Sequence, residues 1–425
     1  WADAYTDTVG RLLAGLDVPR RGLIGPWSHA YPHIAEPGPA IDFIGEAVRW
    51  WDHWLKGRDN GAMDGPMLRA WLQDSTAPAA RQPSVPGHWV SEPVWPPRED
   101  RDRHWHLADS RLTAEPAESV TAICSPQDTG LASGAWCGYG LGDGPADQRI
   151  DDAKSAAFAT APLGAAVAVL GTPVVTLDIA ANHLTGTIAV RLLDIAPDGA
   201  STRVSYGLLA LSHRDSHSDP CPMQPGLRTR VTLRLNDIGW RFLPGHRIAV
   251  AVSTAYWPTA WPAPAPLTLQ IYGTSRLAVP IRTGRPEDDV LLPFAPPPPI
   301  GTLPHQRRRT PDRGRTVTID FAGGLTKLIA RKDRGAIHLD GIDLDVDASG
   351  EERFVIDPAD PLSARVETHW DCAMARGDWT MSSTSDVVMT ADAAQFHIEA
   401  RLVVREGDAV VSNRHWSVAI PRDGI

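Results

Sequence analysis

Short apolar runs separated by turn residues fill the middle of the sequence and constrain its fold more than any other feature. Between residues 172 and 273 these runs are "TPVVTLDIAA", "GTIAVRLLDIA", "RVSYGLLALS", "RVTLRLNDI", "HRIAVAVS" and "LTLQIYG". Their length and β-branched content are typical of strands, and "APDGAS" (196–201) predicts a hairpin between two of them. Six or more strands without long helical patterns predict an antiparallel sandwich or jelly roll over residues 66–287.

The first 65 residues have a different pattern. In "DAYTDTVGRLLAGL" (3–16) and in "PAIDFIGEAVRWWDHWLKG" (39–57) the apolar side chains recur at helical spacing. Between these segments, "GLIG" (22–25) predicts a short strand. The order helix, strand, loop, helix is typical of a layered α/β domain. We therefore expect residues 1–65 to form part of such a domain.

The last third of the chain is expected to divide into a linker and a second β domain. Residues 288–315 contain four consecutive prolines followed by five arginines, a composition that predicts an extended linker. The arginines could attract an anionic partner, but a solvated linker is the simpler interpretation in an acidic chain. In "FHIEARLVVREGDAVV" (396–411) apolar and charged residues alternate, which predicts an antiparallel sheet with one wet face within residues 316–425.

Charge and cysteine content narrow the function classes. The formal net charge of −10 argues against a nucleic-acid partner. The four cysteines form no C-x-x-C pair, so neither a thiolate metal site nor any other cofactor is expected, and their scarcity favours a cytoplasmic location. Residues 155–177 are uncharged but contain two prolines and two glycines, which predicts strands and no membrane span. The β domains are also compatible with a homo-oligomer.

One histidine stands where a catalytic base is expected. The turn "GPWSH" (25–29) follows the first predicted strand and ends at His29, and Asp3 lies before the preceding helix. In α/β-hydrolases the order along the chain is nucleophile, acid, histidine, and Asp3 and His29 fit the last two places. A carboxylate holds an imidazole in the tautomer that takes a proton from serine. Asp3 and His29 could therefore be the acid and base of a Ser-His-Asp triad; the alternative from these residues alone is that His29 is an ordinary hydrogen-bonded loop residue.

The nucleophile of that triad is missing from the sequence. No G-x-S-x-G motif occurs, and "GTSRL" (273–277) fails at its last position. The serine is therefore expected on an upstream segment or on another chain, and this chain alone is expected to be an incomplete enzyme.

The 16 tryptophans leave a second function open. A Trp-rich jelly roll can bind carbohydrate by stacking, and Trp257 and Trp261 in "YWPTAWP" (256–262) are the candidates. Packing of this loop against the hydrolase domain is the simpler interpretation, because Pro258 and Pro262 stiffen it.

Several segments together carry a family resemblance. They are "WADAYTD" (1–7), "GLIGPWSH" (22–29), "EAVRWWDHWLKG" (46–57), "AWCGYGLGDG" (135–144), "VLGTPVVTLDIAA" (169–181), "FLPGHRIAVAVS" (242–253) and "FHIEARL" (396–402). With them the chain resembles the CocE/NonD family, the hydrolases similar to cocaine esterase and X-Pro dipeptidyl-peptidase. The resemblance covers nearly the whole chain.

The resemblance implies a fold and an activity. The expected fold is the C-terminal part of an α/β-hydrolase, then a β jelly roll (a galactose-binding-like sandwich), then an extra antiparallel β region. The expected activity is that of a serine hydrolase, an esterase, acylase or X-Pro dipeptidyl-peptidase, acting on a small ester or amide through an acyl-enzyme. By position in the motifs, Asp3 is the acid, His29 the base, and Tyr5 a substrate-binding aromatic near the acyl pocket.

Overall fold

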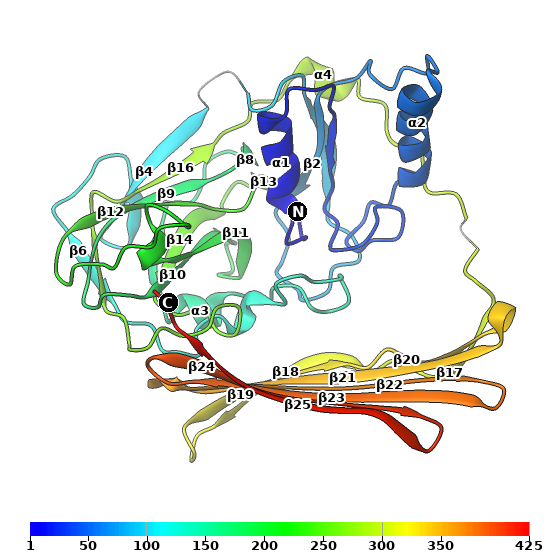
Figure 1. The fold of residues 1–425 in the computed structure, drawn as a ribbon. Coiled ribbons are helices and arrows are strands. Elements are labelled where there is room, and N and C mark those ends of the chain that lie inside the picture. The colour runs from blue at the N-terminus through cyan, green and yellow to red at the C-terminus, as the bar shows by residue number, and fades with distance from the viewer. Residues whose placement is uncertain (98–100, 300, 425) are drawn as a thin grey trace.

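The computed structural model describes residues 1–97, 101–299 and 301–424. Helices are few: α1 (Thr6–Gly15), α2 (Phe43–Lys56), α3 (Arg149–Asp152) and α4 (Pro286–Asp289). The described strands form three sheets, and the chain is a mostly-β sandwich with a broad additional sheet beneath it (Figure 1). None of the helices in these ranges has the length and apolar character that crossing a bilayer requires.

The first sheet joins the N-terminal segment to the sandwich. Its strands are β1 (Gly22–Ile24), β2 (Leu68–Asp74), β13 (Ile238–Phe242) and β8 (Val167–Gly171) in that order, with β3 (Gly87–Glu92) also on β2. β1 pairs with β2 in parallel, starting at Gly22 opposite Leu68. Helix α1 packs on this sheet through Leu13, which is 3% exposed. The boundary expected at residues 65/66 therefore falls inside one sheet.

The second sheet contains the runs that the sequence predicts as strands. It consists of β4 (Asp102–Ala108), β5 (Arg111–Thr113), β6 (Val120–Ile123), β7 (Ala156–Ala159), β9 (Val174–Ala181), β10 (Thr187–Ile195), β11 (Ser201–Ala210), β12 (Thr229–Arg234), β14 (Arg247–Ser253), β15 (Leu269–Tyr272) and β16 (Arg276–Pro280). The predicted hairpin joins β10 to β11 with Ile195 opposite Ser201. Alternate residues such as Val175, Leu177 and Ile179 are fully buried, in one core with side chains of β8 and β13. This shared core makes the two sheets a sandwich.

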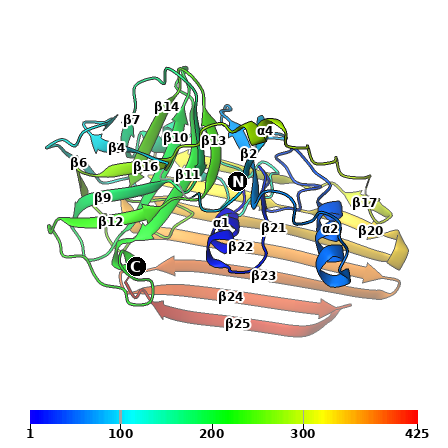
Figure 2. The same cartoon turned by 90° about the horizontal axis from the view of Figure 1, so that it is seen from above.

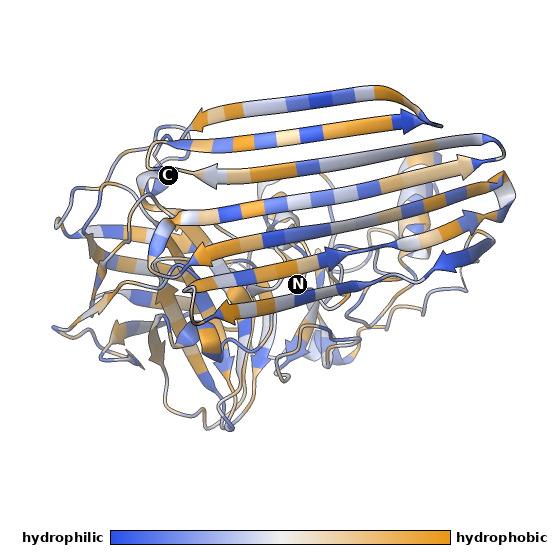
Figure 3. Ribbon diagram, turned by 90° about the horizontal axis from the view of Figure 1, so that it is seen from below, coloured by the Kyte–Doolittle hydropathy of each residue, from blue (hydrophilic) through white to orange (hydrophobic). Residues whose placement is uncertain are grey.

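The third sheet is antiparallel and unusually long-stranded. Its strands are β17 (His305–Arg309), β18 (Arg313–Asp320), β19 (Leu325–Lys332), β20 (Gly335–Leu339), β21 (Leu344–Asp357), β22 (Asp360–Arg376), β23 (Trp379–Ala391), β24 (Gln395–Glu406) and β25 (Ala409–Pro421). Hydrophilic and hydrophobic residues alternate along them (Figure 3), as the sequence predicts for 396–411. The sheet runs beneath both the sandwich and α2 (Figure 2).

The expectation of a linker over residues 288–315 is wrong at its C-terminal end. β17 and the start of β18 lie inside it, because the arginine-rich residues pair with β20 and β19. Side chains in β17 are all exposed, so its composition resembles that of a solvated segment although its backbone is in a sheet. Residue 300 lies outside the described residues.

The tryptophan loop lies between the sandwich and the third sheet. Trp257 is 1% exposed and packs with Leu328 and Ile356, and Trp261 packs against the same cluster. The rings of Trp257 and Trp261 meet edge to face at 5.4 Å. The loop is therefore packed, as the simpler interpretation predicts, but it packs against the C-terminal sheet and not against the hydrolase domain. Trp257 has no free face on which a sugar could stack.

Candidate active site

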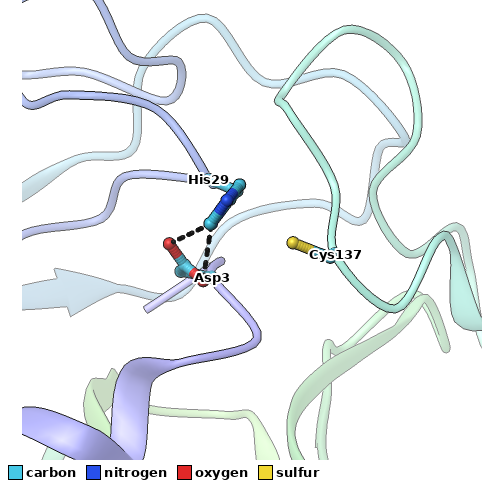
Figure 4. A group of neighbouring side chains, drawn as sticks. All are labelled: Asp3, His29 and Cys137. Atoms are coloured by element: carbon cyan, nitrogen blue, oxygen red, sulfur yellow. Dashed lines mark hydrogen bonds and ion pairs between the residues drawn. The ribbon is translucent and has the colours of Figure 1, made fainter.

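Asp3 and His29 meet as the chain order predicts. Asp3 lies just before α1, and His29 follows β1 after the Gly25-Pro26 turn. The Nδ1 atom of His29 lies 3.1 Å from Oδ2 and 3.4 Å from Oδ1 of Asp3 (Figure 4). Both side chains are partly accessible, with 39% of His29 and 28% of Asp3 exposed. The pair thus has the geometry of an acid that orients a base.

Backbone hydrogen bonds fix both members of the pair. The Tyr5 N–H donates to Oδ1 of Asp3 at 2.9 Å, which leaves Oδ2 directed at the imidazole. The His29 N–H donates to the carbonyl of Gly138 at 2.9 Å. Gly138 belongs to a glycine-rich loop of the sandwich more than 100 residues away in the chain. His29 is therefore held by a segment outside residues 1–65.

Two aromatic rings lie against the imidazole, and a third packs on one of them. The ring of Tyr5 lies 5.4 Å from His29, that of Tyr139 meets His29 edge to face at 5.5 Å, and Trp136 meets Tyr5 at 6.1 Å. All three aromatic side chains are more than half exposed. Tyr5 was expected here, whereas Trp136 and Tyr139 were missed as site residues. Their only signal was the "AWCGYG" segment, which carries the family resemblance but no recognisable chemical motif.

A cavity of about 160 Å³ opens beside Asp3. Asp3, Ser28 and Trp136 line it together with residues of the sandwich such as Arg203 and Trp240. Tyr5 does not line it; its ring stands beside His29 instead. Ser28 is 3% exposed, and its hydroxyl has no hydrogen-bond partner among the described residues.

Cys137 places a thiol beside the pair. Its sulfur, a carboxylate oxygen of Asp3 and a ring nitrogen of His29 all lie within 4.8 Å of one another (Figure 4). Among the described residues, this is the one group of three side chains whose possible metal-ligand atoms lie this close together. Burial, followed by the negative charges of Asp3 and Asp143, raises the pKa of the Cys137 thiol. A thiol whose pKa is raised in this way is a weaker nucleophile than a thiolate.

Helix α2 has an apolar stripe that the described part of the chain leaves open. All 14 residues of α2 are described and none is buried. Its apolar stripe is open to solvent, with Val48 53%, Trp51 55% and Leu55 75% exposed. β1 pairs with β2 on one side, and no described strand pairs with its other edge. An amphipathic helix and a parallel strand left in this state lack the layer that normally covers them.

Comparison with known proteins identifies the family. A family model described as the X-Pro dipeptidyl-peptidase C-terminal non-catalytic domain matches residues 60–291. The chain belongs to this family. The match covers most of the sandwich; Asp3 and His29 lie outside it.

Relatives of this X-Pro dipeptidyl-peptidase C-terminal family are named as hydrolases. A protein of Mycobacterium bovis named as a serine esterase is 27% identical over 55% of this chain and 40% of its own length. The cocaine esterase of Rhodococcus sp. is 24% identical over 61% of this chain and 48% of its own length. The chain thus spans less than half of each relative. The predicted resemblance to CocE/NonD hydrolases is confirmed.

An aminopeptidase from a marine sediment Thaumarchaeota archaeon superposes with a TM-score of 0.49 and 19% identity, covering 65% of this chain and 50% of that one.

Proposed function

We propose that this chain is the C-terminal part of a serine hydrolase in which Asp3 and His29 are the acid and base of a Ser-His-Asp triad. The observation that carries the proposal is the hydrogen bond between Oδ2 of Asp3 and Nδ1 of His29 at 3.1 Å. This contact leaves Nε2 as the nitrogen that takes the serine proton. Membership of a family whose relatives are named esterases is consistent with it.

The proposed reaction proceeds through an acyl-enzyme. Nε2 of His29 takes the hydroxyl proton as serine Oγ attacks the carbonyl carbon of the ester or amide, and Asp3 stabilises the imidazolium that forms. The imidazolium then returns the proton to the leaving alcohol or amine. A water molecule activated by the same nitrogen hydrolyses the acyl-serine. The exposed rings of Tyr5, Trp136 and Tyr139 form one wall of the acyl site and favour a small substrate with an apolar acyl group.

The serine is proposed to lie on a segment upstream of this chain. Support comes from the apolar stripe of α2 and the outer edge of β1, which no described residue covers or pairs with and which suit further parallel strands of an α/β-hydrolase layer. The relatives are more than twice as long as the part that matches, which leaves room for that layer. In this arrangement residues 1–65 complete the hydrolase domain and bring the acid and base to its serine.

Covalent labelling tests the proposal. The full-length protein is treated with a fluorophosphonate, which reacts with a serine activated by its histidine. We expect labelling of the wild-type protein and its loss in His29→Ala. His104→Ala, a change at an exposed position in β4, is the matched control and should label normally. Equal labelling of His29→Ala and His104→Ala would overturn the assignment of His29.

A further inference from the structure

We infer that Asp3, His29 and Cys137 together form a binding site for a thiophilic divalent cation, with Zn²⁺ as the best match, and that the bound cation switches off the base. The absence of a C-x-x-C pair argued against a thiolate metal site from sequence. The fold assembles a different set, in which one carboxylate, one imidazole and one thiol come from three separate segments. These are the ligand types that zinc takes in proteins, and three protein ligands plus one water is a common arrangement.

The distances require only a small closure of the cluster. A tetrahedral zinc needs about 3.4 Å between a nitrogen and an oxygen ligand, and about 3.6 Å from sulfur to either. The Asp3 and His29 atoms already lie 3.1 to 3.4 Å apart. The sulfur lies within 4.8 Å of a carboxylate oxygen of Asp3 and a ring nitrogen of His29, so it must approach them by about 1.2 Å at most. Rotation of the Cys137 side chain can supply a movement of this size.

Carboxylates and a hydroxyl near the cluster favour the binding of a cation. Asp143 adds a second carboxylate on the loop that carries Cys137, where its oxygens accept the backbone N–H groups of Tyr139 and Gly140. A divalent ion neutralises this charge and displaces the thiol proton. Ser28 adds an unpartnered hydroxyl, 3% exposed, in the cavity that Asp3 also lines. A metal-bound water is the kind of group that such a hydroxyl can hydrogen-bond.

Zinc bound at this site would prevent His29 from acting as a base, because Nε2 could no longer accept a proton. If zinc binds Nδ1 of His29, the one proton of the neutral imidazole must be on Nε2, which then cannot accept a proton from serine. If zinc binds Nε2, it occupies that lone pair directly. The inhibitory part of the inference rests on the proposed function, whereas the binding site itself does not.

Metal titration of this chain tests the site without any activity. With Co²⁺ as a spectroscopic substitute for Zn²⁺, we expect a thiolate-to-cobalt charge-transfer band that Zn²⁺ abolishes by displacement. Cys137→Ser should remove the band and weaken zinc binding at this site by at least about tenfold. Cys372→Ser, at a half-buried free cysteine in β22, is the matched control and should keep both. A thiolate band that survives in Cys137→Ser, or its absence from the wild type, overturns the site.

A second arm uses fluorophosphonate labelling of the full-length protein. We expect Zn²⁺ to slow labelling of the wild type and a chelator to restore it. Relative to its own labelling rate without metal, Cys137→Ser should require at least about tenfold more Zn²⁺ than the wild type for the same fractional inhibition. Equal sensitivity of the two proteins overturns the inhibitory role. If the full-length protein does not label at all, the proposed function fails while the titration still decides the metal site.

Discussion

Replacing Asp3 by asparagine should abolish most activity by reversing a single hydrogen bond. In the wild type, Oδ1 of Asp3 accepts the Tyr5 N–H at 2.9 Å and Oδ2 faces Nδ1 of His29 at 3.1 Å. An asparagine has one acceptor oxygen. Because the Tyr5 N–H can only donate, that oxygen must stay on Tyr5, and the amide NH₂ must then face His29. Nδ1 becomes the acceptor, so the imidazole proton moves to Nε2.

The magnitude follows from this tautomer change. An imidazole protonated on Nε2 cannot take the serine proton, and the equivalent substitution in a Ser-His-Asp triad lowers the rate about 10⁴-fold. At 1.36 kcal/mol for each factor of ten, the loss of transition-state stabilisation is about 5 kcal/mol. Folding should be almost unaffected, because the asparagine has nearly the same size and keeps the Tyr5 hydrogen bond.

Two measurements check this prediction. Nitrogen-15 NMR of this chain should show the His29 proton on Nδ1 in the wild type and on Nε2 in Asp3→Asn. Fluorophosphonate labelling of the full-length protein should slow by about four orders of magnitude. Asp17→Asn, a change at an exposed carboxylate after α1, is the control and should alter neither. An unchanged tautomer would refute the hydrogen-bond reasoning, and near-normal labelling of Asp3→Asn would remove Asp3 from the triad.

Three further predictions concern stability. Burial raises the pKa of Asp237 to about 6, so the folded protein keeps a proton that the unfolded chain releases. The free energy of unfolding should fall by about 3 kcal/mol as the pH rises from about 4 to about 6, and urea unfolding of Asp237→Asn should lack this fall. Arg282→Met should lower the free energy of unfolding by about 3 kcal/mol, because Glu92 and Asp288, 1% and 9% exposed, lose a buried partner. Trp257→Ala should cost about 3–5 kcal/mol and speed hydrogen exchange in β19 and β21.

Matched controls separate these effects from general damage. Arg228→Met breaks an ion pair whose arginine is 48% exposed, and should cost no more than about 1 kcal/mol. Trp379→Ala removes a tryptophan that is 41% exposed and should leave exchange in β19 and β21 unchanged. A cost for Arg228→Met equal to that for Arg282→Met, or unfolding that is independent of pH in the wild type, would contradict the burial arguments.

The elements near the site were largely predictable because their signals are local. The helical spacing in 3–16 and 39–57 predicted α1 and α2, and the apolar runs of 172–273 predicted the sandwich strands. A side chain's period along a helix or strand depends on neighbours a few residues away, so the sequence carries it directly. The same reading placed Asp3 and His29 on loops beside the first strand.

Strand pairing was harder to predict from the sequence than the elements themselves, and the arginine-rich segment shows why. Residues 305–309 have the composition of a solvated linker, yet they form β17 because β20 presents an edge for pairing. The parallel pairing of β1 with β2 likewise crosses an expected domain boundary. Backbone hydrogen bonds are made by every residue type, so composition does not reveal which segments share them.

The sequence by itself determined the local elements and the two residues that can act as acid and base. Only the tertiary structure decided that Trp136, Cys137 and Tyr139 join them, since these residues lie on a loop over 100 positions further along the chain. Glycines at 134, 138 and 140 mark that loop as a turn but do not indicate where it goes. Backbone hydrogen bonds to distant segments hold the loop, from Gly144 to Ala80 and from His29 to Gly138, and composition does not reveal such partners. For that reason a lone cysteine in the sequence becomes, in the fold, a neighbour of the proposed base.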